Sequence, residues 1–115
     1  MSDATGTFTA EDIRFGGGVG ESDRALVAET MQEIIGRLGQ FREQADAELS
    51  VKDRDSADPK TTLEVTVPGL PKVVATSAER ELRDALNEVS DIAVRQLRKQ
   101  MERREAKGSR DTIRG

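Results

Sequence analysis

"KTTLEVTVPGLPKVVATSAE", residues 60–79, is the stretch that decides the fold. In its first half, apolar residues such as Leu63 and Val65 alternate with threonine or glutamate, which is typical of a half-buried strand. Pro68 and Gly69 suit the two central positions of a type II turn. The second half continues as another strand, so the stretch predicts a β-hairpin.

Two further strands are expected on the N-terminal side of this hairpin. Residues 45–51 alternate between apolar and polar side chains and predict a third half-buried strand. A short strand is predicted near the N-terminus, where Ile13 and Phe15 share one face before a run of glycines. A helix then begins near Ser22 or Asp23, because both residue types cap helices.

Two apolar stripes at helical spacing predict two helices. The first stripe consists of Val27, Met31, Ile34, Ile35, Leu38 and Phe41. The second lies in a longer helix, expected from about Ser77 to Glu105, and consists of Leu82, Leu86, Val89, Ala93 and Leu97.

The resulting order, β-α-β-β-β-α, predicts an α+β two-layer sandwich in which both helices cover one face of a four-stranded sheet. The first helix connects the first two strands, which favours parallel pairing through a right-handed crossover. A chain of 115 residues is enough for one small domain. We expect it to occupy residues 12–104, with flexible tails at residues 1–11 and 105–115.

The composition argues against an enzyme. The chain has no cysteine, so it has no disulfide and no thiolate metal site. It also has no histidine, which is the commonest metal ligand. We therefore expect no catalytic residue, no metal, no cofactor and no small-molecule substrate. No apolar run is long enough to cross a membrane, and a soluble, cytoplasmic protein is expected.

Two short motifs have unremarkable interpretations. "GGGVGES", residues 16–22, lacks the Gly-Lys-Ser/Thr ending of a phosphate loop and is read as a flexible connection. Asp53, Asp55 and Asp58 lack the central glycine and closing glutamate of a calcium-binding EF-hand, so a solvated loop is expected.

Charge is distributed unevenly along the chain. Residues 1–91 hold 10 basic and 19 acidic residues, whereas residues 92–115 hold 8 basic and 3 acidic residues. This asymmetry leaves two interpretations open: a solvated helix end whose cations complement the helix dipole, or a contact with a polyanion. From charge alone the two are equally favoured.

The sequence "ELRDALNEVSDIAVRQLRK", residues 81–99, resembles the second helix of the bacterial ribosome hibernation-promoting factors and ribosome-associated inhibitor A proteins. The alignment of this stretch needs no gaps. "LEVTV", residues 63–67, is similar to the third strand of that family, and Ser22-Asp23 to the start of its first helix. The resemblance covers about residues 12–104 and is to the short form of the family, which lacks a dimerisation domain.

The resemblance implies a non-enzymatic factor that binds ribosomal RNA of the small subunit. It would block the messenger and transfer RNA sites and preserve idle ribosomes during stress or stationary phase. Guanidinium groups suit this role because they make bidentate contacts with phosphate. The candidate contacts are Arg95, Arg98, Lys99, Arg103, Arg104, Arg83, Arg37, Arg42 and Lys72.

The alternative is an interaction module of another class. Its amphipathic charged helix would serve a protein partner, or a weak homodimer in which the basic helix pairs with acidic stretches of a second copy.

Overall fold

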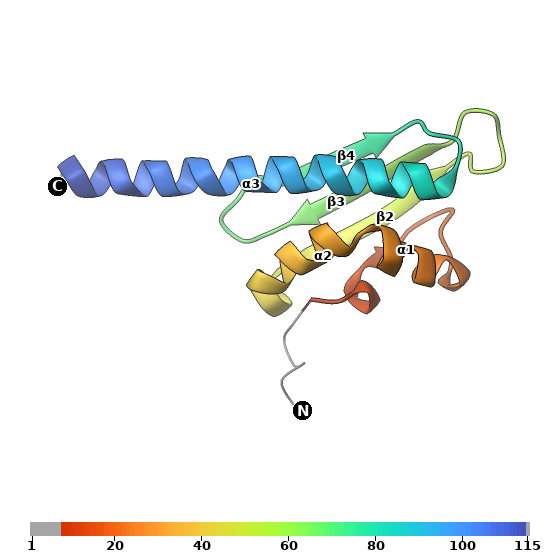
Figure 1. Ribbon diagram of the computed structural model, residues 1–115, viewed down its shortest axis with the longest axis horizontal. Helices are drawn as coiled ribbons and strands as arrows, with labels where there is room; N and C mark the ends of the chain where they lie inside the picture. The colour runs from red at the N-terminus through yellow and green to blue at the C-terminus, as the bar shows by residue number, and fades with distance from the viewer. Residues whose placement is uncertain (1–7, 115) are drawn as a thin grey trace, which may run out of the picture.

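The computed structural model describes the backbone of residues 8–114 and the side chains of residues 8–41 and 44–104 (Figure 1). The strands are β1 (Arg14–Phe15), β2 (Asp46–Lys52), β3 (Lys60–Thr66) and β4 (Val73–Ser77). The helices are α1 (Arg24–Thr30), α2 (Gln32–Leu38) and α3 (Leu82–Arg114). Short 3-10 turns occupy Ala10–Asp12, Glu21–Asp23 and Gly39–Gln44.

The four strands form one mixed sheet in the order β1-β2-β3-β4. β1 pairs with β2 in parallel, and the other neighbours are antiparallel. The hairpin between β3 and β4 closes as predicted, since the Leu70 N–H donates to the Val67 carbonyl at 3.1 Å. Gly69 lies at φ +84°, which the third position of a type II turn requires.

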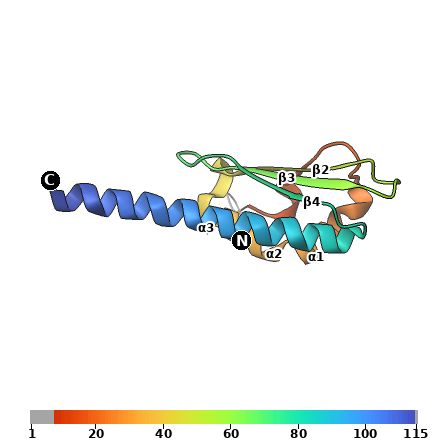
Figure 2. The same cartoon turned by 90° about the horizontal axis from the view of Figure 1, so that it is seen from above.

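All three helices pack on one face of the sheet, as Figure 2 shows. The inward residues of β3, Leu63 and Val65, are each 1% exposed. α3 brings Leu86, Ala93 and Leu97 against them, and these are at most 1% exposed. Each fully buried leucine contributes about 1.5–3 kcal/mol to folding. The predicted α+β two-layer fold and the inward direction of both helical stripes are confirmed.

The first helical region is two helices and not one. The helix breaks at Met31, where φ is −112° and ψ is 26°. The Thr30 hydroxyl donates to the Leu26 carbonyl at 2.8 Å, and this kind of back-bonding bends helices. Hydrogen bonding resumes at once, because the Ile35 N–H reaches the Met31 carbonyl at 3.0 Å. Met31 itself is fully buried, so the break keeps the apolar stripe on the core.

α3 begins and ends later than the sequence predicted. Ser77 remains in β4, paired with Thr61, and its hydroxyl hydrogen-bonds the Glu88 carboxylate at 2.5 Å. At the other end the helical backbone runs past Glu105 to Arg114. Side chains beyond residue 104 lie outside the described ones, and the flexibility of that end stays a prediction.

The predicted N-terminal tail is too long. Residues 1–7 lie outside the described part of the chain, but Phe8 is only 5% exposed and belongs to the core. Thr9 caps the following 3-10 turn: its hydroxyl accepts from the Glu11 N–H, and its own N–H donates to the Asp12 carboxylate. The packed part of the chain therefore includes residues 8–11, which the prediction assigned to the tail.

The glycines after β1 continue its pairing with β2. The Gly16 N–H donates to the Leu49 carbonyl, and the Gly17 carbonyl accepts from the Val51 N–H, both at 2.8 Å. Gly18 has φ +80°, and a Cβ there would overlap the Val51 carbonyl. This part of "GGGVGES" is therefore a close backbone approach between two strands, and it needs glycine for that reason.

Candidate nucleic-acid interface

The middle of α3 presents a group of cations to solvent. Arg95, Arg98 and Lys99 are all exposed, while Leu97 between them is 1% exposed and faces the sheet. The pattern follows from helix geometry, since residues three and four apart share a face at 3.6 residues per turn. α3 is thus held by its apolar stripe on a rigid sheet and carries its charges on the opposite face.

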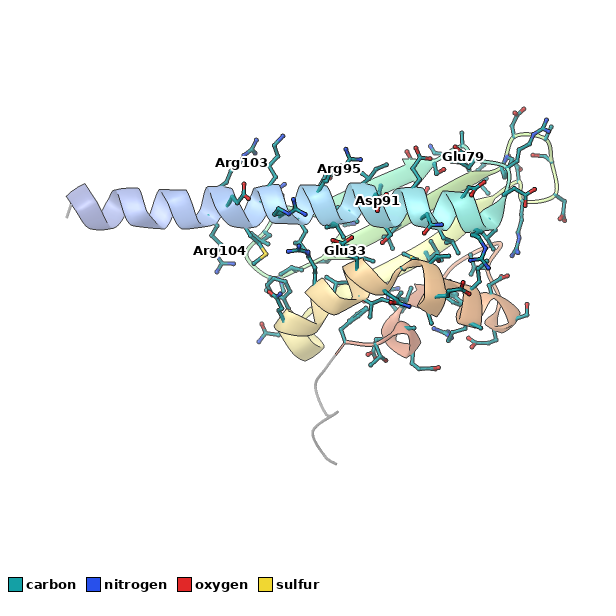
Figure 3. The ribbon with its side chains drawn as sticks, in the orientation of Figure 1. Glu33, Glu79, Asp91, Arg95, Arg103 and Arg104 are labelled. Carbon is teal, nitrogen blue, oxygen red and sulfur yellow. The ribbon has the colours of Figure 1, made fainter. Side chains whose placement is uncertain are left out.

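Arg103 and Arg104 do not point in the same direction. Figure 3 shows them projecting from opposite sides of α3, with Arg95 on the side of Arg103. Arg104 lies over the β3–β4 turn, where a Cβ on Gly69 would be 3.3 Å from its Nη1 atom. The nine steps from Arg95 to Arg104 amount to about 180° around a helix. Arg104 is exposed but lies on the opposite side of α3 from Arg95, and its contact with RNA stays a prediction. We call Arg95, Arg98, Lys99 and Arg103 the cationic face.

Two other predicted contacts are engaged in ion pairs elsewhere. Arg83 reaches across to Glu29 of α1 at 2.9 Å, and this hydrogen bond raises the pKa of the guanidinium. Lys72 pairs with Glu64 at 3.3 Å. Glu64 points away from the buried side chains of β3, so Lys72 lies on the uncovered side of the sheet, remote from the cationic face.

The remaining two candidates belong to the end of the first helical region. Arg37 is half-buried in the last turn of α2, one turn after Glu33. Arg42 lies in the turn Gly39–Gln44, and its side chain is outside the described residues.

Two shallow hollows flank Arg95 and Arg98. The larger, of about 500 Å³, is lined by Ile92, Arg95, Gln96, Arg98, Lys99 and Glu102. The smaller, of about 270 Å³, is lined by Glu33, Asp91, Val94, Arg95 and Arg98. The two guanidinium groups thus form a ridge. The hollow on one side adds Lys99 and a single carboxylate, Glu102, and the hollow on the other side adds two carboxylates.

The sequence analysis missed the other residues of these hollows. Ile92 and Gln96 flank the predicted basic residues at helical spacing, so periodicity around α3 was the signal that could have found them. Glu33 belongs to α2, and only the packing of α2 beside α3 brings its carboxylate to Arg95 and Arg98.

The exposed face of α3 changes sign along its length. Asp84, Glu88 and Asp91 are exposed on the first turns of α3, and the cations of the same face begin at Arg95. Any polyanion is therefore attracted to the stretch from Arg95 onward and repelled from the turns before it.

The described residues offer little for other chemistry. Among them there is no group of three or more histidine, cysteine, aspartate or glutamate side chains placed to hold a metal ion. Within the same part of the chain, no helix combines the length and the apolar character needed to span a membrane.

Comparison with known proteins supports the fold and shows the family. The fold is similar to that of the N-terminal domain of Protein Y from Thermus thermophilus, with a TM-score of 0.50 and 16% sequence identity. The match covers 70% of this chain and 88% of that one. No curated protein sequence matches. A family model described as "Sigma 54 modulation protein / S30EA ribosomal protein" matches residues 19–105. This confirms the resemblance found in residues 81–99, and the chain belongs to this family of ribosome-associated modulation factors.

Proposed function

We propose that this protein binds ribosomal RNA of the small subunit through the cationic face of α3. Bound there, it occupies the region used by messenger and transfer RNA and keeps idle ribosomes inactive during stress or stationary phase. It acts by binding and not by catalysis, and it works in the cytoplasm. The observation that carries the proposal is the grouping of exposed cations on one rigid helix, in a family of ribosome-associated factors.

The physical chemistry supports RNA as the ligand. Folded RNA is recognised largely through its backbone and shape, which calls for a basic surface on a rigid element. α3 provides such a surface, since the buried side chains Val89, Ala93 and Leu97 fix its rotation against the sheet. The overall charge of −4 does not oppose binding, because the field near the contacting face determines the encounter.

The test is co-sedimentation with purified small subunits over a series of salt concentrations. The triple variant Arg95→Ala, Arg98→Ala, Lys99→Ala should bind more weakly and show a flatter dependence on salt. Each lost phosphate contact lowers the slope by about one unit or less. Because all three side chains are exposed, the variant should remain folded, which circular dichroism would verify.

A matched control removes the same charge from the other end of the sheet. The variant Lys52→Ala, Lys60→Ala, Arg80→Ala also loses three exposed cations, so its net charge equals that of the test variant. We expect it to bind nearly as the wild type does. Equal weakening of both variants would mean that only net charge matters, and unchanged binding of the first variant would overturn the proposal.

A second candidate function is a weak homodimer through α3. The acidic turns of its exposed face, with Glu88 and Asp91, complement the basic turns of α3 in a second copy when the two helices lie antiparallel. Exposed ion pairs contribute only about 0–1 kcal/mol each, so such a dimer would form at high concentration and low salt. Sedimentation equilibrium at two salt concentrations tests it, and a monomer under both conditions would exclude it.

A further inference from the structure

The larger hollow on α3 has a composition that phosphate binding alone does not explain. Its lining includes the apolar side chain of Ile92 and the amide of Gln96, one helical turn apart, together with three cations and the carboxylate of Glu102. Ile92 is half-buried and packs against the core, so it is a fixed apolar surface. Gln96 is exposed and its amide both donates and accepts hydrogen bonds.

The smaller hollow restricts where an RNA strand can lie. Glu33 and Asp91 place two carboxylates beside Arg95 and Arg98 on the side of α2. Phosphate groups held by these guanidinium groups are repelled from that side. A phosphate bound by these guanidinium groups is therefore favoured on their other side, next to the larger hollow that Ile92 and Gln96 line.

We propose that this larger hollow receives one unpaired nucleobase of the bound RNA, read by the amide of Gln96. The inference rests on the proposed function and adds that the contact depends on a base as well as on phosphates. One face of the base lies on Ile92, the plane of a neighbouring guanidinium stacks against the base, and the flanking phosphates meet Arg95 and Lys99. Unpaired bases are recognised in this way in single-stranded loops and bulges of RNA.

The chemistry favours adenine. A glutamine amide can donate to N7 and accept from N6 of adenine, which makes it the usual bidentate partner of that base. The hollow is shallow and open to solvent, so space does not limit the occupant.

The experiment compares Gln96→Met with wild type, using fluorescein-labelled 12-nucleotide oligoadenylate, oligouridylate and a 12-base-pair RNA duplex as probes. Methionine keeps the length and helix propensity of glutamine but removes its hydrogen bonds. We expect oligoadenylate binding to weaken at least fivefold, since a bidentate base contact is worth about 1–3 kcal/mol. Its salt dependence should stay unchanged because no charge is lost. Binding of the duplex should not change.

The matched control is Gln32→Met, which alters an exposed amide on α2 and should leave all three affinities unchanged. Two results would overturn the inference. In the first, Gln96→Met binds oligoadenylate as tightly as the wild type does; in the second, its affinities for oligoadenylate and for the duplex fall by the same factor. The triple cation variant, assayed with small subunits, separates the two proposals. If the triple variant no longer binds small subunits while Gln96→Met binds oligoadenylate as the wild type does, only the base contact fails. If it binds as wild type does, the proposed function itself fails.

Discussion

Replacing Asp23 with asparagine is expected to lower the free energy of unfolding by about 2 kcal/mol at neutral pH. The Asp23 carboxylate is 12% exposed and accepts hydrogen bonds from Arg54 Nη1 at 2.7 Å and Nη2 at 3.0 Å. It also accepts from the Gly20 N–H at 3.0 Å. Arg54 donates in addition to the Gly18 carbonyl at 2.8 Å, so the pair joins the start of α1 to the loop after β2.

The magnitude follows from what asparagine can retain. One of its two terminal atoms is an NH₂ group, which cannot accept from either Arg54 or Gly20. Hydrogen bonds to charged groups contribute about 1.5–3 kcal/mol each, and a buried group left unpaired costs more. Arg54 is 38% exposed and can regain water when it loses its partner, so the net loss falls near the lower end of that range.

The effect should depend on pH in a defined direction. The hydrogen bonds from Arg54 hold the pKa of Asp23 below its ordinary value, against the opposing effect of burial. Stabilisation from such a group is complete above the unfolded pKa of about 3.9 and is lost as pH falls through the folded pKa. The difference between wild type and Asp23→Asn should therefore be constant above about pH 5 and shrink below about pH 4.

Urea unfolding followed by circular dichroism between pH 3 and pH 7 measures this difference. Asp46→Asn is the control, since Asp46 also pairs with an arginine, Arg14, but their side chains are 48% and 57% exposed. Its effect should be smaller because solvent screens the pair. A penalty for Asp23→Asn that is equal at pH 3 and pH 7, or no larger than the control, would refute the reasoning.

Two further predictions concern the packing of the fold, one at the approach of the backbone to β2 and one in the core. Gly18→Ala should destabilise the protein by at least about 2 kcal/mol, because φ is +80° and the new methyl group would overlap the Val51 carbonyl; thermal melting measures this, and an unchanged Tm would contradict it. Leu86→Ala should cost about 2–5 kcal/mol, since the side chain is 0% exposed. Its control in urea unfolding is the exposed Arg98→Ala, and similar values for the two would contradict the assignment of the buried face.

The sheet was predictable because its signal is local. Leu63 and Val65 alternate with polar residues, and the turn at Gly69 requires a residue that tolerates positive φ. The break at Met31 was not predictable from periodicity, since the residues on both sides of it keep the same stripe. Phe8 was missed because a single aromatic residue has no period, and only the folded chain shows the core surface that it covers.

The candidate site was predictable in part for the same reason. Arg95, Arg98 and Lys99 are opposite the apolar stripe, and the sequence spacing alone places them there. Arg104 is also a candidate contact, and 100° per residue already separates it from Arg95 by about half a turn. Glu33 could not be assigned to the site from sequence, because its position depends on how α2 packs beside α3.

In the proposed RNA complex, the distribution of charge on α3 favours one orientation as well as a contact. The cations begin at Arg95, while Asp84 and Glu88 lie on the preceding turns of the exposed face. A helix rises about 1.5 Å per residue, so Glu88 lies about 10 Å and Asp84 about 16 Å before Arg95 along the axis, and the Debye length at physiological salt is about 8 Å. Repulsion from Glu88 and attraction to Arg95 therefore act on neighbouring phosphates of one stretch of RNA backbone. A uniformly basic helix could slide along such a backbone, whereas a helix with acidic first turns loses attraction as soon as it shifts toward those turns. The acidic residues thus favour one register along the backbone, which phosphate contacts alone would not set.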